Sequence, residues 1–128
     1  MTDTITNQED IIDSRDIIER LEELSSYDLS DLSDDDLEEL RTLKALADEA
    51  EPESRDWVHG ETLIRRSYWV QYVEDLIHDC YPMPKEMHSG KWPFLHMTMD
   101  YEAAAQDLLE SDYSSVDFDG VEYLIRSC

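Results

Sequence analysis

The N-terminal part of the chain carries apolar residues at helical spacing, separated by mostly acidic ones. A first stripe predicts a helix from about residue 8 to 25, with an apolar face made by Ile11, Ile18, Leu21 and Leu24. Thr6 followed three residues later by Glu9 has the form of a capping box, which favours a helix start at this point. We therefore expect an amphipathic first helix.

A second stripe predicts a helix that ends near Ala50, with an apolar face made by Leu37, Leu40, Leu43 and Leu46. Ser33 followed by Asp36 is typical of an N-cap, and three consecutive aspartates suit the positive end of the helix dipole. Pro52 cannot continue the helix. The two predicted helices would form an antiparallel acidic hairpin over residues 8–51.

The following part of the chain is richer in aromatic residues. It predicts a helix over residues 61–80, whose apolar stripe comprises Leu63, Tyr68, Tyr72, Leu76 and Cys80. Trp69 lies off this stripe, so we expect it to be the most exposed of the aromatic residues in the helix. Residues 81–97 hold three prolines and a glycine, which predicts an irregular loop anchored by Trp92 and Phe94.

The clearest local signal lies near the C-terminus. Asp119-Gly120 separates two alternating runs and predicts a β-hairpin with a type I′ turn, because both central residues of that turn need positive φ. The register places Asp117 directly across from Glu122, a like-charge pair that is destabilising in a sheet. The apolar face of the hairpin would comprise Val116, Phe118, Val121, Tyr123 and Ile125.

A short helix capped by Asp100 and extending to Leu109 precedes the hairpin, and we expect its Ala104 and Leu108 to pack on the apolar face of the hairpin. An apolar content of 41% is too high for a disordered acidic tail. The chain is therefore predicted to form one α+β domain over residues 1–128, mostly helical. It would comprise an N-terminal acidic helical hairpin, a central amphipathic helix, a short helix and a C-terminal β-hairpin.

The charge of the chain restricts its partners. It holds 33 acidic and 10 basic residues, a formal net charge of -23, and residues 1–56 alone hold 20 acidic and 5 basic ones. B-DNA carries about one negative charge per 1.7 Å of axis, so this charge matches roughly 39 Å of duplex. Phosphate contacts need clusters of Lys and Arg, so we expect no binding to nucleic acids or membranes and favour a basic protein.

Two groups of acidic residues are candidate partner-binding carboxylates. For the aspartates that start the second predicted helix, a local role at the helix N-terminus is an alternative explanation. It does not explain the total charge, because a helix that needs only solubility can alternate signs and gain ion pairs at i,i+4. The first cluster comprises Asp28, Asp31, Asp34, Asp35, Asp36, Glu38, Glu39, Glu49 and Glu51. The second comprises Asp117, Asp119 and Glu122.

The sequence does not predict an active site. It has no nucleophile elbow, no phosphate-binding glycine loop and no His-Glu-x-x-His motif, so we expect neither enzymatic activity nor a cofactor. His78 and Cys80, with two later histidines, lack the spacing of zinc ligands, and residues 28–40 lack the glycine and the period of an EF-hand. We expect no specific metal site, although loose binding of divalent ions, and regulation by them, stays open.

The segment MTDTITNQED has no basic start followed by an apolar stretch, and no run of 18 apolar residues is long enough to span a bilayer. We therefore expect a cytoplasmic protein. In that compartment Cys80 and Cys128 are expected to be reduced thiols rather than a disulfide. The sequence is also compatible with a homodimer.

The run WPFLHMTMDYEAAAQDLLESDYSSVDFDGVEYLIR resembles the C-terminal part of ArdA-like antirestriction proteins and related small acidic proteins of phages and plasmids. The upstream run WVHGETLIRRSYWVQYVEDLIHD is similar to the helix that precedes it in such proteins, so the resemblance covers about residues 57–126. It implies DNA mimicry, in which carboxylates replace phosphates in the DNA channel of a host enzyme. The acidic hairpin of residues 8–51 lies outside the resemblance.

These observations lead to two functional hypotheses. The first is a phage or mobile-element inhibitor of a host defence system in the bacterial cytoplasm, bound to a restriction enzyme or a CRISPR surveillance complex in place of DNA. The alternative is an acidic adaptor or chaperone for a basic nucleic-acid-binding protein, which would use the same charges without reducing the activity of its partner. In both hypotheses the carboxylates attract the basic partner and occupy its binding surface, and none of them acts as a catalyst.

Overall fold

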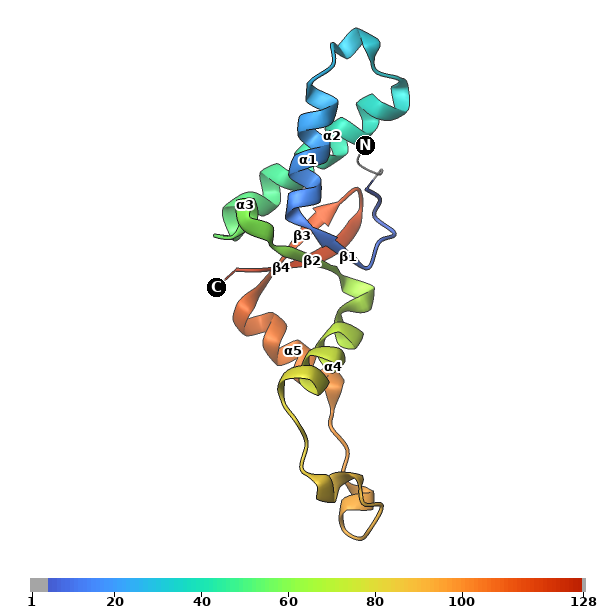
Figure 1. Ribbon diagram of the computed structural model, residues 1–128, viewed down its shortest axis with the longest axis vertical. Helices are drawn as coiled ribbons and strands as arrows, with labels where there is room; N and C mark the ends of the chain where they lie inside the picture. Colours follow the sequence, from blue (N-terminus) through green and yellow to red (C-terminus); the bar gives the residue numbers. More distant parts are fainter. Residues whose placement is uncertain (1–4, 128) are drawn as a thin grey trace.

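A four-stranded antiparallel sheet lies at the centre of the molecule and has helices on both of its faces (Figure 1). The computed structural model describes residues 5–127. Its strands are β1 (Ile11–Asp13), β2 (Thr62–Arg65), β3 (Tyr113–Phe118) and β4 (Val121–Arg126). Their order in the sheet is β1-β2-β4-β3. β2 therefore lies between β1, from the N-terminal part of the chain, and β4, from the C-terminal part.

The helices form two layers, one on each face of the sheet. Three of them lie on one side: α1 (Ser14–Ser25), α2 (Asp34–Ala50) and the short α3 (Trp57–Gly60). The other side is covered by α4 (Trp69–Cys80) and α5 (Tyr101–Asp112). These elements confirm the predicted α+β class with a mostly helical content. No helix among the described residues combines the length and the apolar character needed to cross a membrane.

Because both faces of the sheet are covered, its central strands are buried on both sides. β4 contains three consecutive buried residues, Tyr123, Leu124 and Ile125. Ile125 pairs with Leu63 of β2 and faces α1 and α2, whereas Leu124 faces α4 and α5. The two faces therefore hold two separate apolar clusters, and the sheet lies between them.

The predicted hairpin forms with the predicted register, but its packing differs. Asp119 and Gly120 have φ values of 49° and 86°, as a type I′ turn requires. The expectation that Ala104 and Leu108 cover the face of Val116 is wrong, because α5 packs on the opposite face, around Leu124. The face of Val116 is covered by α1 and α2 instead.

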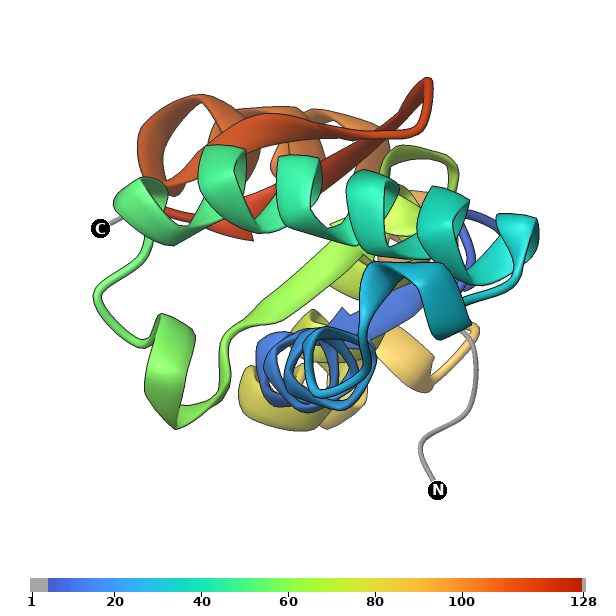
Figure 2. The same cartoon turned by 90° about the horizontal axis from the view of Figure 1, so that it is seen from above.

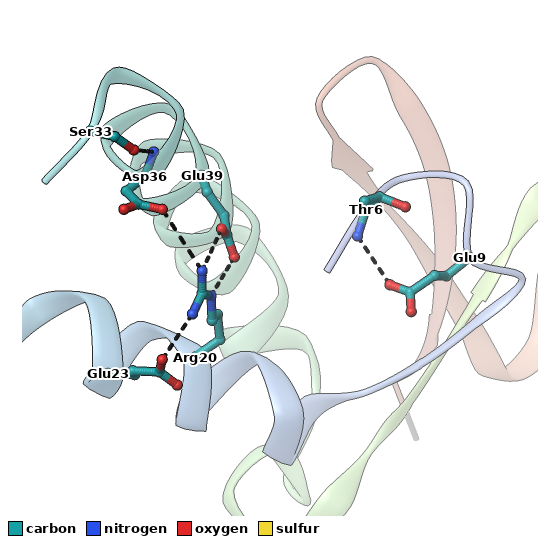
Figure 3. Close-up of polar contacts among 7 residues, drawn as sticks. All are labelled: Thr6, Glu9, Arg20, Glu23, Ser33, Asp36 and Glu39. Carbon is teal, nitrogen blue, oxygen red and sulfur yellow. Dashed lines mark hydrogen bonds and ion pairs between the residues drawn. The ribbon is translucent and has the colours of Figure 1, made fainter. Parts of the chain in front are cut away.

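The first helix starts later than its sequence pattern predicts. Residues 11–13 form β1, in which Ile12 pairs with Leu63 of β2, and α1 begins only at Ser14. The predicted contact of Thr6 with Glu9 does form, at 3.0 Å from the N–H to the carboxylate, but it closes a turn rather than a helix (Figure 3). Pairing with a distant strand therefore overrides the helical spacing of the local sequence.

The N-cap of α1 is Asp13, which the sequence analysis did not identify. Its carboxylate accepts a hydrogen bond of 2.9 Å from the Arg15 N–H. The Arg15 guanidinium also donates to both carboxylate oxygens, at 3.2 and 2.7 Å. These hydrogen bonds, with the positive charge of Arg15, lower the pKa of Asp13 below its usual value. A charged aspartate is thereby held at the positive end of the helix dipole.

The predicted helix over residues 61–80 is divided. Its first residues form β2, a 3-10 turn (Arg66–Tyr68) follows, and α4 starts only at Trp69. β2 pairs with β1 on one side and with β4 on the other, so the β-branched Ile64 has a strand partner on both sides and lies in the middle of the sheet. The apolar residues whose four-residue spacing predicted one helix therefore belong to a strand, a 3-10 turn and a helix.

Trp69 is fully buried, which contradicts the expectation that it is exposed. Its indole N–H donates to the Ala105 carbonyl at 2.9 Å, and its ring lies against Tyr72 and Tyr113. Trp92 was expected to anchor its loop, but its side chain is 77% exposed. The two tryptophans thus have the reverse of their predicted roles.

The predicted starts of α2 and α5 are confirmed. Ser33 accepts a hydrogen bond from the Asp36 N–H at 3.1 Å, and Asp100 accepts one from the Ala103 N–H at 3.0 Å. α2 ends at Ala50 as expected, while α5 continues past Leu109. α1 and α2 pack together as a helical hairpin, but Figure 2 shows α1 nearly end-on and α2 lying across the view, so the two helices cross.

Replacing Trp69 with alanine should lower the free energy of unfolding by about 3 to 5 kcal/mol, because it removes a large buried side chain and its hydrogen bond. The matched variant Trp92→Ala should change it by less than about 0.5 kcal/mol, because that side chain is exposed. Urea denaturation of both variants at low protein concentration measures the difference. Equal losses of stability would contradict the burial assigned to Trp69.

Candidate functional site

One buried arginine joins α1 to the acidic helix α2 (Figure 3). The Arg20 guanidinium donates to both carboxylate oxygens of Glu39, from Nε at 2.6 Å and from Nη2 at 2.9 Å. Its Nη1 donates to Glu23 at 3.0 Å, and its Nη2 lies 4.0 Å from the carboxylate of Asp36. One guanidinium therefore compensates the charge of three carboxylates from two helices.

The interior position of this cluster makes it structurally important. The side chains of Arg20 and Glu39 are only 7% and 11% exposed. The hydrogen bonds to Glu39 and the surrounding negative charges raise the pKa of Arg20, despite the opposing effect of burial. A buried ion pair is costly to break from one side, because the remaining partner keeps its charge without compensation.

This arrangement uses two of the predicted partner-binding carboxylates to stabilise the contact between α1 and α2. Glu39 is held in the buried pair and presents no free carboxylate, whereas Asp36 lies 4.0 Å from Arg20 and keeps 40% of its side chain exposed. The sequence contains a signal for this pair, because Arg20 falls in the apolar stripe of α1 between Ile17 and Leu24. A charged residue at such a position indicates a buried partner on a neighbouring element.

The other predicted carboxylates of α2 are exposed. Asp34 and Asp35 lie in its first turn, where the helix dipole favours negative charge, and Glu38 follows one turn later. Glu38 forms an ion pair with the exposed Arg41. Exposed pairs of this kind contribute little stability and can exchange one partner for another. α2 therefore presents carboxylates to solvent along its N-terminal half.

The structure brings the two predicted acidic clusters together. β3 is an edge strand, and the N–H of Asp117 donates to the carboxylate of Glu49 on α2 at 3.2 Å. A shallow hollow beside this contact is lined by Arg41, Glu49 and the hairpin residues Asp117 and Asp119. Acidic residues separated by about 70 positions in the sequence thus border one surface.

A second hollow lies between α2, the hairpin turn and the N-terminal segment. Its apolar lining consists of the buried side chains Ile5, Leu43 and Phe118. The exposed carboxylates on its border are Asp35, Glu38 and Asp119. A hollow with this lining suits a lysine or arginine side chain. The aliphatic stem can pack on the apolar surface while the cationic group stays near the carboxylates and water. We call this feature the acidic hollow.

The N-terminal segment is held beside the acidic hollow by contacts with the sheet. The Asn7 amide donates to the Asp119 carbonyl at 3.2 Å, and Arg65 donates to the Asn7 carbonyl at 2.9 Å. The buried Tyr123 hydroxyl donates to the Glu9 carbonyl, and burial raises the pKa of Tyr123 to about 12. These hydrogen bonds fix one side of the acidic hollow against the hairpin.

The remaining predicted residues lie elsewhere. Asp117 and Glu122 face one another across the strands as predicted, and Arg66 lies 3.8 Å from Glu122, which offsets part of their repulsion. Asp28 and Asp31 lie in the connection between α1 and α2, at the upper end of the molecule in Figure 1. The last predicted residue, Glu51, follows the end of α2. Of the predicted residues, Asp35, Glu38, Glu39 and Asp119 therefore line the acidic hollow, and the others lie outside it.

Within residues 5–127 no three His, Cys, Asp or Glu side chains gather in an arrangement that could hold a metal ion. His78 instead forms a hydrogen bond of 2.8 Å with the Tyr101 hydroxyl. Cys80 is an exposed free thiol, and Cys128 lies outside the described residues.

The variant Arg20→Met should lower the free energy of unfolding by about 3 kcal/mol, because Glu39 keeps a buried charge without its cation. Adding Glu39→Met should recover most of this loss, since the uncompensated charge is then removed as well. The exposed pair provides a control, in which Arg41→Met should cost less than about 1 kcal/mol. Urea denaturation measures all of these variants, and a double variant no more stable than the single one would contradict the assignment.

The density of carboxylates predicts a salt-dependent stability. Raising sodium chloride from about 0.01 to 0.5 M screens repulsion between exposed charges, and the melting temperature should rise by roughly 4 °C for each 1 kcal/mol of repulsion removed. Calorimetry at constant pH measures the shift. A melting temperature that stays constant or falls with salt would mean that the carboxylates are too dispersed to repel one another.

A scan against protein-family models gave no match for this chain, and searches of curated proteins and of solved structures gave none either. The resemblance of residues 57–126 to ArdA-like antirestriction proteins therefore stays a prediction. The observations that bear on function are those of the chain itself: its charge, the acidic hollow and the exposed carboxylates of α2 and the hairpin.

Proposed function

We propose that this protein inhibits a nucleic-acid-binding complex of a host defence system by occupying its DNA-binding surface as an acidic mimic of DNA. The observation that carries the proposal is the meeting of two acidic segments around the acidic hollow. Asp35 and Glu38 come from α2, and Asp119 comes from the hairpin turn. A net charge of -23 supports a basic partner, because opposite potentials favour association.

The proposed mechanism has two steps: electrostatic attraction of the basic partner, followed by occupation of its DNA-binding channel. The negative field of the molecule attracts a basic channel over a distance set by the Debye length, about 8 Å at physiological ionic strength. On contact, the exposed carboxylates of α2 replace phosphates as acceptors for lysine and arginine. One basic side chain would enter the acidic hollow, with its stem against Leu43 and Phe118. No bond of the partner or of DNA is broken in this mechanism.

The buried cluster around Arg20 supports such a role through rigidity. It fixes α2 to α1 through Glu39, and Glu49 fixes α2 to the edge of the sheet. The carboxylates that would contact a partner are therefore held by packed elements rather than by a free acidic tail. A rigid surface loses less conformational entropy on binding than a disordered segment does.

The first experiment is the capture of a partner. Tagged full-length protein should retain a restriction or CRISPR complex from a lysate of bacteria with active defence systems, and short duplex DNA should displace it. The activity of the complex should fall as the protein is added. A basic protein that stays active while bound would support the adaptor function instead, and capture that resists duplex DNA would contradict mimicry.

Two variants with the same loss of charge locate the contact. The first neutralises the border of the acidic hollow through Asp35→Asn, Glu38→Gln and Asp119→Asn. The second neutralises exposed carboxylates of α4 and α5 through Asp79→Asn, Glu102→Gln and Asp107→Asn. The first should weaken binding to the captured complex by about tenfold or more, and the second by less than about threefold. Equal effects would mean that only total charge matters and that the acidic hollow is not the contact.

A further inference from the structure

The segment between α4 and α5 projects from the body as an arm (Figure 1). It spans residues 81–99 and contains two 3-10 turns, Lys85–His88 and Phe94–His96, which lie against each other. In Figure 1 the arm forms the lower end of the molecule, whereas the connection between α1 and α2 forms the upper end. The arm is thus at the end of the long axis that lies opposite the acidic helical hairpin.

The arm exposes large apolar side chains. Most of the exposed large hydrophobic residues in the described part of the chain belong to it: Tyr81, Trp92, Leu95, Met97 and Met99. The Trp92 side chain is 77% exposed, more than any other of this group. Tryptophan and methionine are enriched at the centres of protein interfaces. Five exposed apolar side chains within residues 81–99 of a highly charged protein indicate an interaction surface.

The charge of the arm differs from that of the rest of the chain. Lys85, Glu86 and Lys91 are its only formally charged residues, so its net charge is +1 with neutral histidines, against -24 for the other residues. Of the 33 acidic residues, 32 lie outside the arm, so a contact through the rest of the surface of two copies would bring carboxylates together. A contact between two arms brings apolar side chains together. It keeps the acidic remainder of each copy at opposite ends of the dimer. The repulsion between the acidic parts of the two copies is thereby reduced, and added salt screens what remains of it.

We propose that the arm is a homodimer interface, in which residues 81–99 of two copies pack against each other. A basic partner is a poorer occupant, because Lys85 and Lys91 would face its positive charge. Such a dimer is isologous, since the same surface serves in both copies, and it closes without forming chains. It leaves the acidic hollow and the exposed carboxylates of α2 free in both copies, and it does not depend on the function proposed above.

Sedimentation equilibrium of the full-length protein tests this proposal. At concentrations from about 5 to 200 μM, the mass should rise from the 15.0 kDa of one chain toward twice that value. Dimerisation should strengthen as salt increases, because screening reduces the repulsion between the bodies. Binding of a DNA-competed partner should instead weaken with salt, so the two proposals can fail independently.

Two pairs of substitutions locate the dimer contact. Trp92→Ser with Met97→Ser should weaken dimerisation by at least about tenfold, because it removes two of the exposed apolar side chains of the arm. Tyr27→Ser with Leu29→Ser changes exposed apolar residues at the opposite end and should leave it unchanged. Circular dichroism checks that both variants stay folded. A wild-type protein that remains monomeric, or a dimer that only the second pair weakens, would overturn the proposal and assign the arm to another occupant.

Discussion

The pairing of β2 with two distant strands is the interaction on which the rest of the structure depends. β2 lies between β1, which leads directly into α1, and β4, which completes the hairpin. One short strand thereby holds the N-terminal helical layer and the C-terminal hairpin in a fixed relation. Because of this relation, the carboxylates of α2 and of the hairpin turn border the same surface. α2 also packs directly on β3, where Glu49 accepts the hydrogen bond from Asp117.

A surface of this kind repels itself, and the structure contains specific contacts that oppose the repulsion. Arg20 compensates three carboxylates where α1 meets α2. Glu49 accepts a hydrogen bond from the edge of the sheet, and Arg66 lies beside Glu122. The few basic residues near these sites thus support the fold, while most of the acidic residues stay at the surface. This division gives the molecule a rigid and strongly negative surface.

Elements with local signals could be predicted from the sequence, and elements set by distant pairing could not. The cap at Ser33 and the turn at Asp119-Gly120 depend on neighbouring residues, and both form as predicted. Residues 62–65 have helical spacing but form a strand, because two strands far away in the sequence pair with them. The composition of the candidate surface was predictable, but the joining of its two clusters and the burial of Glu39 against Arg20 depend on tertiary packing.

The central claim is that α2 and the hairpin turn form one surface for a basic, DNA-binding partner. Hydrogen–deuterium exchange of this protein, alone and in complex with the captured partner, tests that claim most directly. Slower exchange is expected in both residues 34–49 and residues 115–122, with no change in residues 101–112 of α5. Slower exchange in only one of the first two segments, or mainly in α4 and α5, would contradict it.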